Sequence, residues 1–242
     1  MSQFYTDLVF SPLLAILDVS SSTRSDRKGN SPIKTEARIM PELARLGREH
    51  PTVDQTTLAG LILFSTDAEV ALPIGSSGRL SQLDDEHLNL KAEGLTNFGA
   101  AFDLARTELE ALPQRLRDSG RLHGAKLSLR RPLVVMVTDG AANDDPDERD
   151  QAWRRLVNSK LSPNIVMVGV GDADPDQLKR YKNRRGVALL SKTPDDVSGA
   201  LAGLIDLMQG TIIAMSEGGD DNAMQPIIDE SMIDDDLFEI LE

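Results

Sequence analysis

Apolar residues gather along this chain in short runs that stop abruptly at polar or turn-forming residues. Four runs have the length of a strand, with a shorter fifth: PLLAILDVS, LAGLILFS, PLVVMVTDG, NIVMVGVGD and GVALLS. Because these runs are nearly continuous rather than alternating, they are typical of strands covered on both faces, as in a parallel sheet.

Between these runs, apolar residues recur at helical spacing. The stripe over residues 98–109 predicts a helix, and Pro146 and the pair Asp174-Pro175 indicate two further helix starts. A pattern over residues 33–44 predicts a helix that is kinked or interrupted at Pro41. The segment SGALAGLIDLMQGTIIAMS contains polar interruptions, so we expect an amphipathic helix packed on the domain and no membrane span.

Alternating strands and helices predict an α/β fold, with a doubly wound, mostly parallel central sheet flanked by helices. Ligands of such sheets bind outside the carboxyl ends of the strands, near the point where the strand order reverses. Asp18 and Asp139 each follow an apolar run directly. We therefore expect both acids at this edge of the sheet.

The charge of the chain is unevenly distributed. The formal net charge is −13, but residues 217–242 hold ten acidic residues and no Lys or Arg. We predict a domain over residues 1–216, followed by an acidic C-terminal interaction segment over 217–242 that also carries large apolar residues. Its cover is either a partner groove or the domain's own basic run KRYKNRR at 179–185, and the sequence leaves both open.

Three segments supply oxygen donors that suit a hard cation. Asp18, Ser20 and Ser22 alternate after the first apolar run, so their side chains can project to one side. Thr96 precedes the helix at 98–109, and Asp139 follows the third run. Carboxylates and hydroxyls favour Mg²⁺, Ca²⁺ or Mn²⁺. Each segment also has a plain structural explanation: a Ser-rich turn, a helix N-cap at Thr96, and an ordinary strand-end acid.

The ordered combination D-x-S-x-S, a loop-to-helix Thr and T-D-G resembles the von Willebrand factor A family over roughly residues 11–215. The resemblance implies a metal-ion-dependent adhesion site, with Asp18, Ser20, Ser22, Thr96 and Asp139 as its metal residues. Thr23 stands where many members have Met, and Gly94-Leu95-Thr96 replaces a more usual Gly-Gly-Thr. Within the family, GLTNFGAAFDLA is similar to the bacterial tellurite-resistance (TerY-type) branch.

The resemblance implies a protein that performs no chemistry. It implies metal-dependent recognition, with Mg²⁺ as the expected ion and Ca²⁺ or Mn²⁺ as alternatives, and with a partner acid completing the coordination. In TerY-type systems such a protein is linked with a kinase and a phosphatase, which implies an adaptor role in stress response or phosphosignalling.

The alternative is a metal-dependent phosphotransferase or phosphatase of haloacid-dehalogenase-like type. Such enzymes carry a second acid two positions after the nucleophilic Asp, and Ser20 occupies that position here. No catalytic residue is expected. The acidic charge argues against nucleic-acid binding. The first residues lack the pattern of a signal peptide, so we expect a cytoplasmic protein without membrane contact.

Overall fold

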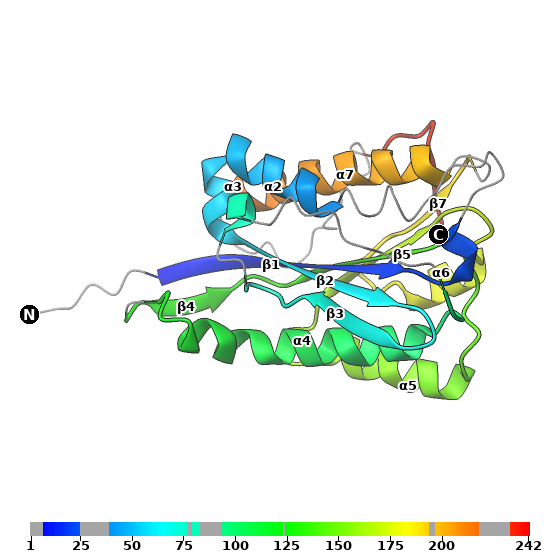
Figure 1. The fold of residues 1–242 in the computed structure, drawn as a ribbon, viewed down its shortest axis with the longest axis horizontal. Helices are drawn as coiled ribbons and strands as arrows, with labels where there is room; N and C mark the ends of the chain where they lie inside the picture. The colour runs from blue at the N-terminus through cyan, green and yellow to red at the C-terminus, as the bar shows by residue number, and fades with distance from the viewer. Residues whose placement is uncertain are drawn as a thin grey trace, which may run out of the picture.

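A β-sheet lies between two layers of helices in the computed structural model of the chain (Figure 1). The structure describes residues 7–24, 39–76, 79–82, 93–122, 124–193, 197–217 and 233–242. The strands are β1 (Asp7–Asp18), β2 (Thr57–Phe64), β3 (Ala68–Leu72), β4 (Lys126–Leu129), β5 (Leu133–Thr138), β6 (Asn164–Gly169), β7 (Ala188–Ser191) and β8 (Phe238–Ile240). The helices are α2 (Ile39–Glu49), α3 (Pro51–Thr56), α4 (Phe98–Asp118), α5 (Pro146–Val157), α6 (Pro175–Tyr181) and α7 (Val197–Glu217), with the short 3₁₀ helices η1 (Ser21–Arg24) and η2 (Leu80–Gln82).

Seven of the eight strands described in the sheet follow the order β3-β2-β1-β5-β6-β7-β8, and the eighth, β4, pairs with β1 outside this order. β1 is parallel to β2 on one side and to β4 and β5 on the other, whereas β3 and β8 are antiparallel edge strands. The chain leaves β1 toward β2 and later returns to β5, so the strand order reverses between β1 and β5. The predicted doubly wound, mostly parallel sheet is confirmed.

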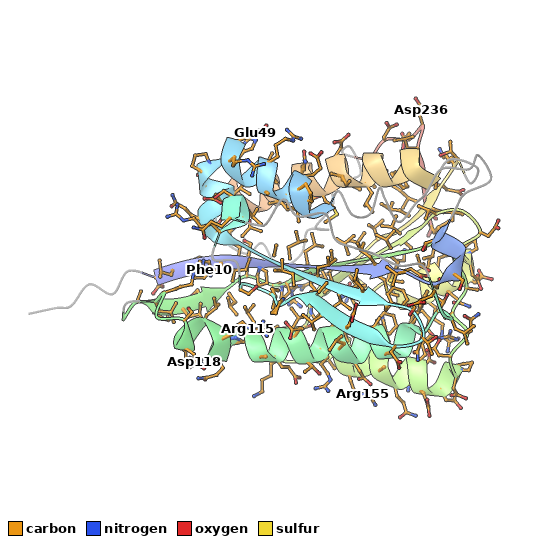
Figure 2. The ribbon with its side chains drawn as sticks, in the orientation of Figure 1. Phe10, Glu49, Arg115, Asp118, Arg155 and Asp236 are labelled. Carbon is orange, nitrogen blue, oxygen red and sulfur yellow. The ribbon has the colours of Figure 1, made fainter. Side chains whose placement is uncertain are left out.

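Each face of the sheet packs against its own helices. Helices α2, α3 and α7 cover one face, while α4 and α5 cover the other (Figure 1). Successive side chains of β1 alternate between the two cores: Leu13 and Leu17 face the α7 side, and Leu14 and Ile16 face the α4 side. Side chains fill the space on both sides (Figure 2). Burial on both faces explains why the strand runs are continuously apolar.

The five strands read from apolar runs are confirmed as β1, β2, β5, β6 and β7. Two predicted helix starts also hold, because Asp145 caps α5 before Pro146 and Asp174 caps α6 before Pro175. In α2 (Ile39–Glu49), Pro41 lies in the first turn, where a missing N–H costs little. Residues 33–38 of that pattern lie outside the described residues.

The end of the chain returns to the sheet. The sequence assigns residues 233–242 to a segment beyond the domain, but β8 pairs with β7, with Phe238 opposite Ser191. Ile233, Phe238 and Leu241 are buried. These ten residues therefore dock on the chain's own sheet, against β7. Residues 218–232 lie outside the described residues.

Two lysines hold this C-terminal strand. Lys182, in the basic run at 179–185, donates to the Leu241 carbonyl at 2.8 Å, and Lys192 donates to the Asp235 carbonyl at 2.6 Å. Both contacts go to main-chain oxygens. In the part of the chain that the structure describes, no helix is both long and apolar enough to cross a bilayer, α7 included.

Candidate functional site

β1 ends in a carboxylate that the fold has buried. Asp18 is 0% exposed. One of its oxygens accepts the Ser20 N–H at 2.9 Å, and the other accepts the Thr138 hydroxyl at 2.6 Å. Burial raises the pKa of Asp18 above its ordinary value, and the hydrogen bonds from Ser20 and Thr138 offset part of that rise. Ionising this group therefore costs free energy unless a cation lies beside it.

The turn after β1 buries a hydroxyl next to this carboxylate. Ser20 is 2% exposed, and its carbonyl accepts both the N–H of Thr23, at 3.1 Å, and the Thr23 hydroxyl, at 2.9 Å. Thr23, which replaces the Met of many members, thus fastens the η1 turn. Ser22 lies in η1, but its side chain is outside what the structure describes.

Thr96 reaches the same place from a distant loop. The plain explanation of Thr96 as an N-cap is wrong, because Asn97 caps α4 by accepting the Ala100 N–H at 2.9 Å. The buried Thr96 hydroxyl instead donates to Ser20 Oγ at 3.2 Å. Capping by its neighbour leaves the Thr96 side chain available to the site.

The end of β5 supplies the second acid. Leu17 pairs with Val137, so the carboxyl ends of β1 and β5 lie side by side. Thr138 bonds to Asp18, and Asp139 follows directly and is 8% exposed. The fold thus brings Asp18, Ser20 and Thr96 together through hydrogen bonds, with Asp139 at the adjoining strand end.

Asn143 also supports the candidate site, although the sequence analysis did not identify it. Its side-chain oxygen accepts the Thr96 N–H at 2.8 Å, and its own N–H donates to the Thr96 carbonyl at 2.8 Å. The next residue, Asp144, accepts the Gly99 N–H at 2.8 Å and pairs with buried Arg149 at 3.0 Å. In the sequence, the polar run Asn143-Asp144-Asp145 soon after T-D-G is the feature that could have drawn attention to this loop. In the structure, the loop holds the Thr96 backbone in position.

The donor set fits a hard divalent cation. The Asp18 carboxylate accepts hydrogen bonds from the Ser20 amide and from the hydroxyls of Thr138 and Ser20, and all of these groups are neutral. A buried carboxylate beside hydroxyl oxygens suits hard cations such as Mg²⁺ better than softer metal ions. No group of three or more His, Cys, Asp or Glu that could hold a metal occurs among the described residues, so a metal here would need the hydroxyls as ligands.

Solved structures of three proteins resemble this fold. They are a von Willebrand factor type A protein from Catenulispora acidiphila (15% identity, TM-score 0.58, 84% of this chain), proximal thread matrix protein 1 from the mussel byssus with a zinc-occupied MIDAS motif (17%, 0.57, 83%), and the pilus adhesin SpaC from Lactobacillus rhamnosus GG (13%, 0.62, 85%). The present chain covers 43%, 48% and 31% of those chains, so it spans less than half of each. At these identities the likeness shows the fold alone.

The haloacid-dehalogenase-like alternative gains no support from these likenesses. Position 20, where such enzymes carry an acid, holds a buried serine bonded to Thr96. Comparison with curated protein sequences returns no match. The family model described as von Willebrand factor type A domain matches residues 13–141, which is more than half of the chain and includes Asp18, Thr96 and Asp139. The chain belongs to the von Willebrand factor type A domain family.

Proposed function

We propose that this protein binds a protein partner through a divalent cation held by Asp18, Ser20, Ser22, Thr96 and Asp139. The proposal rests on the contact between the turn that follows β1 and the loop that precedes α4. There Thr96 Oγ1 lies 3.2 Å from Ser20 Oγ, beside the buried Asp18 carboxylate. Residues 76 positions apart form this contact, and the Thr96 hydroxyl is not needed to cap α4, because Asn97 does so.

The expected ion is Mg²⁺, with Ca²⁺ and Mn²⁺ as alternatives, because the proposed ligands are all oxygens. Two carboxylates and three hydroxyls leave coordination open for an acid from the partner, whose charge would strengthen the contact. A zinc-occupied MIDAS motif in the mussel protein supports a divalent ion on this fold. No catalytic step is part of the proposal.

The resemblance to the tellurite-resistance branch extends the proposal to a biological setting. On this basis the protein acts in the cytoplasm as an adaptor in a bacterial stress-response or phosphosignalling system. Its partner would be a kinase or phosphatase of the same system. This part rests on the segment GLTNFGAAFDLA around Thr96.

Calorimetric titration of the whole chain with Mg²⁺ and with Mn²⁺ tests the site. Wild type should bind one ion. Asp18→Asn and the double variant Ser20→Ala/Ser22→Ala should each lose at least about tenfold in affinity, because each removes charge or donors. Asp103→Asn is the matched control: it removes one acid from the exposed Asp103–Arg155 pair between α4 and α5 and should bind as wild type does.

Equal ion affinity in wild type and in both site variants would remove the assignment. If the ion binds as expected, a second readout tests recognition. A partner captured in Mg²⁺ should be released by EDTA and should not be captured by Asp18→Asn. Capture that persists in EDTA would leave a metal site without the proposed role.

A further inference from the structure

One large apolar side chain is exposed next to the candidate metal site. Among the described residues, two large apolar side chains are classed as exposed: Leu95 at 61% and Val9 at 40%. Single exposed apolar residues are common on protein surfaces and need no explanation by themselves. Leu95 differs in its place, because it directly precedes Thr96, whose hydroxyl bonds to Ser20.

The loop that carries Leu95 is held on both sides. The Gly94 carbonyl accepts the Ser21 N–H at 3.3 Å and the Ser21 hydroxyl at 3.1 Å. The Leu95 N–H donates to Thr66 Oγ1 at 3.0 Å, and the Thr96 N–H donates to Asn143. With three successive residues bonded to three different segments, the backbone keeps the Leu95 side chain in solvent.

The two positions before Thr96 differ in what they tolerate. Gly94 has a φ of +89°, and a Cβ there would lie 2.7 Å from Thr66 Oγ1, so glycine is required. Leu95 has no such constraint and stands where many family members have a second glycine. A glycine would satisfy the backbone, so the fold does not call for a leucine here.

The neighbouring loop adds a smaller apolar surface. Ala141 is exposed two residues after Asp139, and its loop is joined to the Leu95 loop by the paired Thr96–Asn143 hydrogen bonds. Exposed apolar groups therefore flank Thr96 on both loops. A surface that combines a cation with an adjacent apolar rim fits a ligand that has a carboxylate beside an apolar side chain.

We infer that Leu95 is a partner-contacting residue, and that it selects protein segments in which an Asp or Glu lies directly next to a large apolar residue. The inference rests on the proposed metal-dependent recognition. Covering Leu95 removes apolar surface from water and shields the carboxylate–metal contact, so both parts of the ligand bind better together.

A random heptapeptide library displayed on phage tests this selection directly. The library is bound to the whole chain in Mg²⁺ and eluted with EDTA, so that only metal-dependent binders are collected. Wild type should enrich peptides with an acid adjacent to Leu, Ile, Val, Met or Phe. Leu95→Gly should still enrich acids, but without the apolar neighbour.

The affinity of one selected peptide, synthesised free of phage, completes the test. Leu95→Ala should weaken its binding by about tenfold, while Leu95→Met and Val9→Ala should match wild type. Val9 is a suitable control because it lies nine residues before Asp18 on β1, about 30 Å along the strand. The Mn²⁺ affinity of Leu95→Ala should equal that of wild type.

The outcomes separate the two proposals. Acid enrichment without an apolar neighbour, or unchanged peptide affinity in Leu95→Ala, would overturn the role of Leu95 and leave metal-dependent recognition standing. Absence of acid-bearing, EDTA-released peptides from wild type would overturn both.

Discussion

At the scale of single residues, Asp18 combines full burial with a charge. Its carboxylate is held by Ser20 and Thr138, and a buried ion without a counter-ion costs free energy even when it is hydrogen-bonded. In metal-free protein, Asp18→Asn should therefore raise the unfolding free energy by about 1–2 kcal/mol. In this variant the Thr138 hydroxyl can donate to the Gly140 carbonyl, which is 3.2 Å away, and accept a hydrogen bond from the new side-chain amide at position 18.

Urea unfolding in EDTA measures this change. Asp103→Asn, at an exposed acid of α4, should leave the unfolding free energy within about 0.5 kcal/mol of wild type. A metal-free Asp18→Asn protein that is less stable than wild type would show that the carboxylate supports the fold.

Asn143 is predicted to position Thr96. Asn143→Ala removes the acceptor of the Thr96 N–H, so the loop should loosen and the affinity for Mn²⁺ should fall by about tenfold. Asn158→Ala is a matched control, because Asn158 bonds to the Arg154 carbonyl at the end of α5. Calorimetric titration compares them, and equal affinities in both variants would contradict the positioning role.

At the scale of elements, the sequence predicted the buried strands and not the edges. Runs such as that of β5 are buried at all six positions, so their composition alone identifies them. β3 alternates between exposed and half-buried residues, and β4 and β8 have only four and three residues. Such short or alternating strands form because an adjacent strand of the sheet offers hydrogen bonds. Their own composition therefore does not identify them.

The candidate site likewise has a part that the sequence could predict and a part that it could not. The order of Asp18, Ser20, Thr96 and Asp139 could be read from the chain by resemblance. The role of Asn143 could not, because it depends on two loops that meet only after folding.

In β8, we expect the side chains that face the core to stabilise the fold and those that face solvent to contribute little. Phe238 is 2% exposed, whereas its neighbour Glu239 is exposed. Phe238→Ala should lower the unfolding free energy by about 3 kcal/mol, and Glu239→Ala should change it by less than about 0.5 kcal/mol. Urea midpoints of the two variants test this contrast. Equal midpoints would mean that the C-terminal strand adds nothing to the core.

The contact between α5 and α6 should depend on pH. The pKa of Asp150 is lowered, chiefly by hydrogen bonds from Arg180 and then from Tyr181. A lowered pKa means that the folded state favours the carboxylate. The resulting stability is therefore complete above the unfolded pKa of about 4 and is lost as the pH falls through the folded value.

Asp150→Asn and Arg180→Gln should both be less stable than wild type at pH 7, and each difference should shrink below about pH 4. Unfolding free energies measured across this range provide the test. Parallel curves for wild type and both variants would contradict the assigned contact.

At the scale of the whole molecule, the cation should stabilise the fold. An ion that binds only the folded chain adds about 2.7 kcal/mol at 100 times its dissociation constant. For a chain of 242 residues this corresponds to a rise in Tm of about 5–10 °C. Thermal unfolding in Mg²⁺ should show this rise, EDTA should reverse it, and Asp18→Asn should lack it. An equal rise in Asp18→Asn would place the ion elsewhere.

The hydrogen bond from Thr138 to Asp18 joins residues 120 positions apart. Closing so large a loop is slow, because the chain must lose entropy before any contact compensates for it. The acids of the site therefore meet only when β1 and β5 have paired. For the proposed cation site, this means that a nascent chain would lack the complete set of ligands until β5 has left the ribosome, so ion binding during synthesis is expected only after that point.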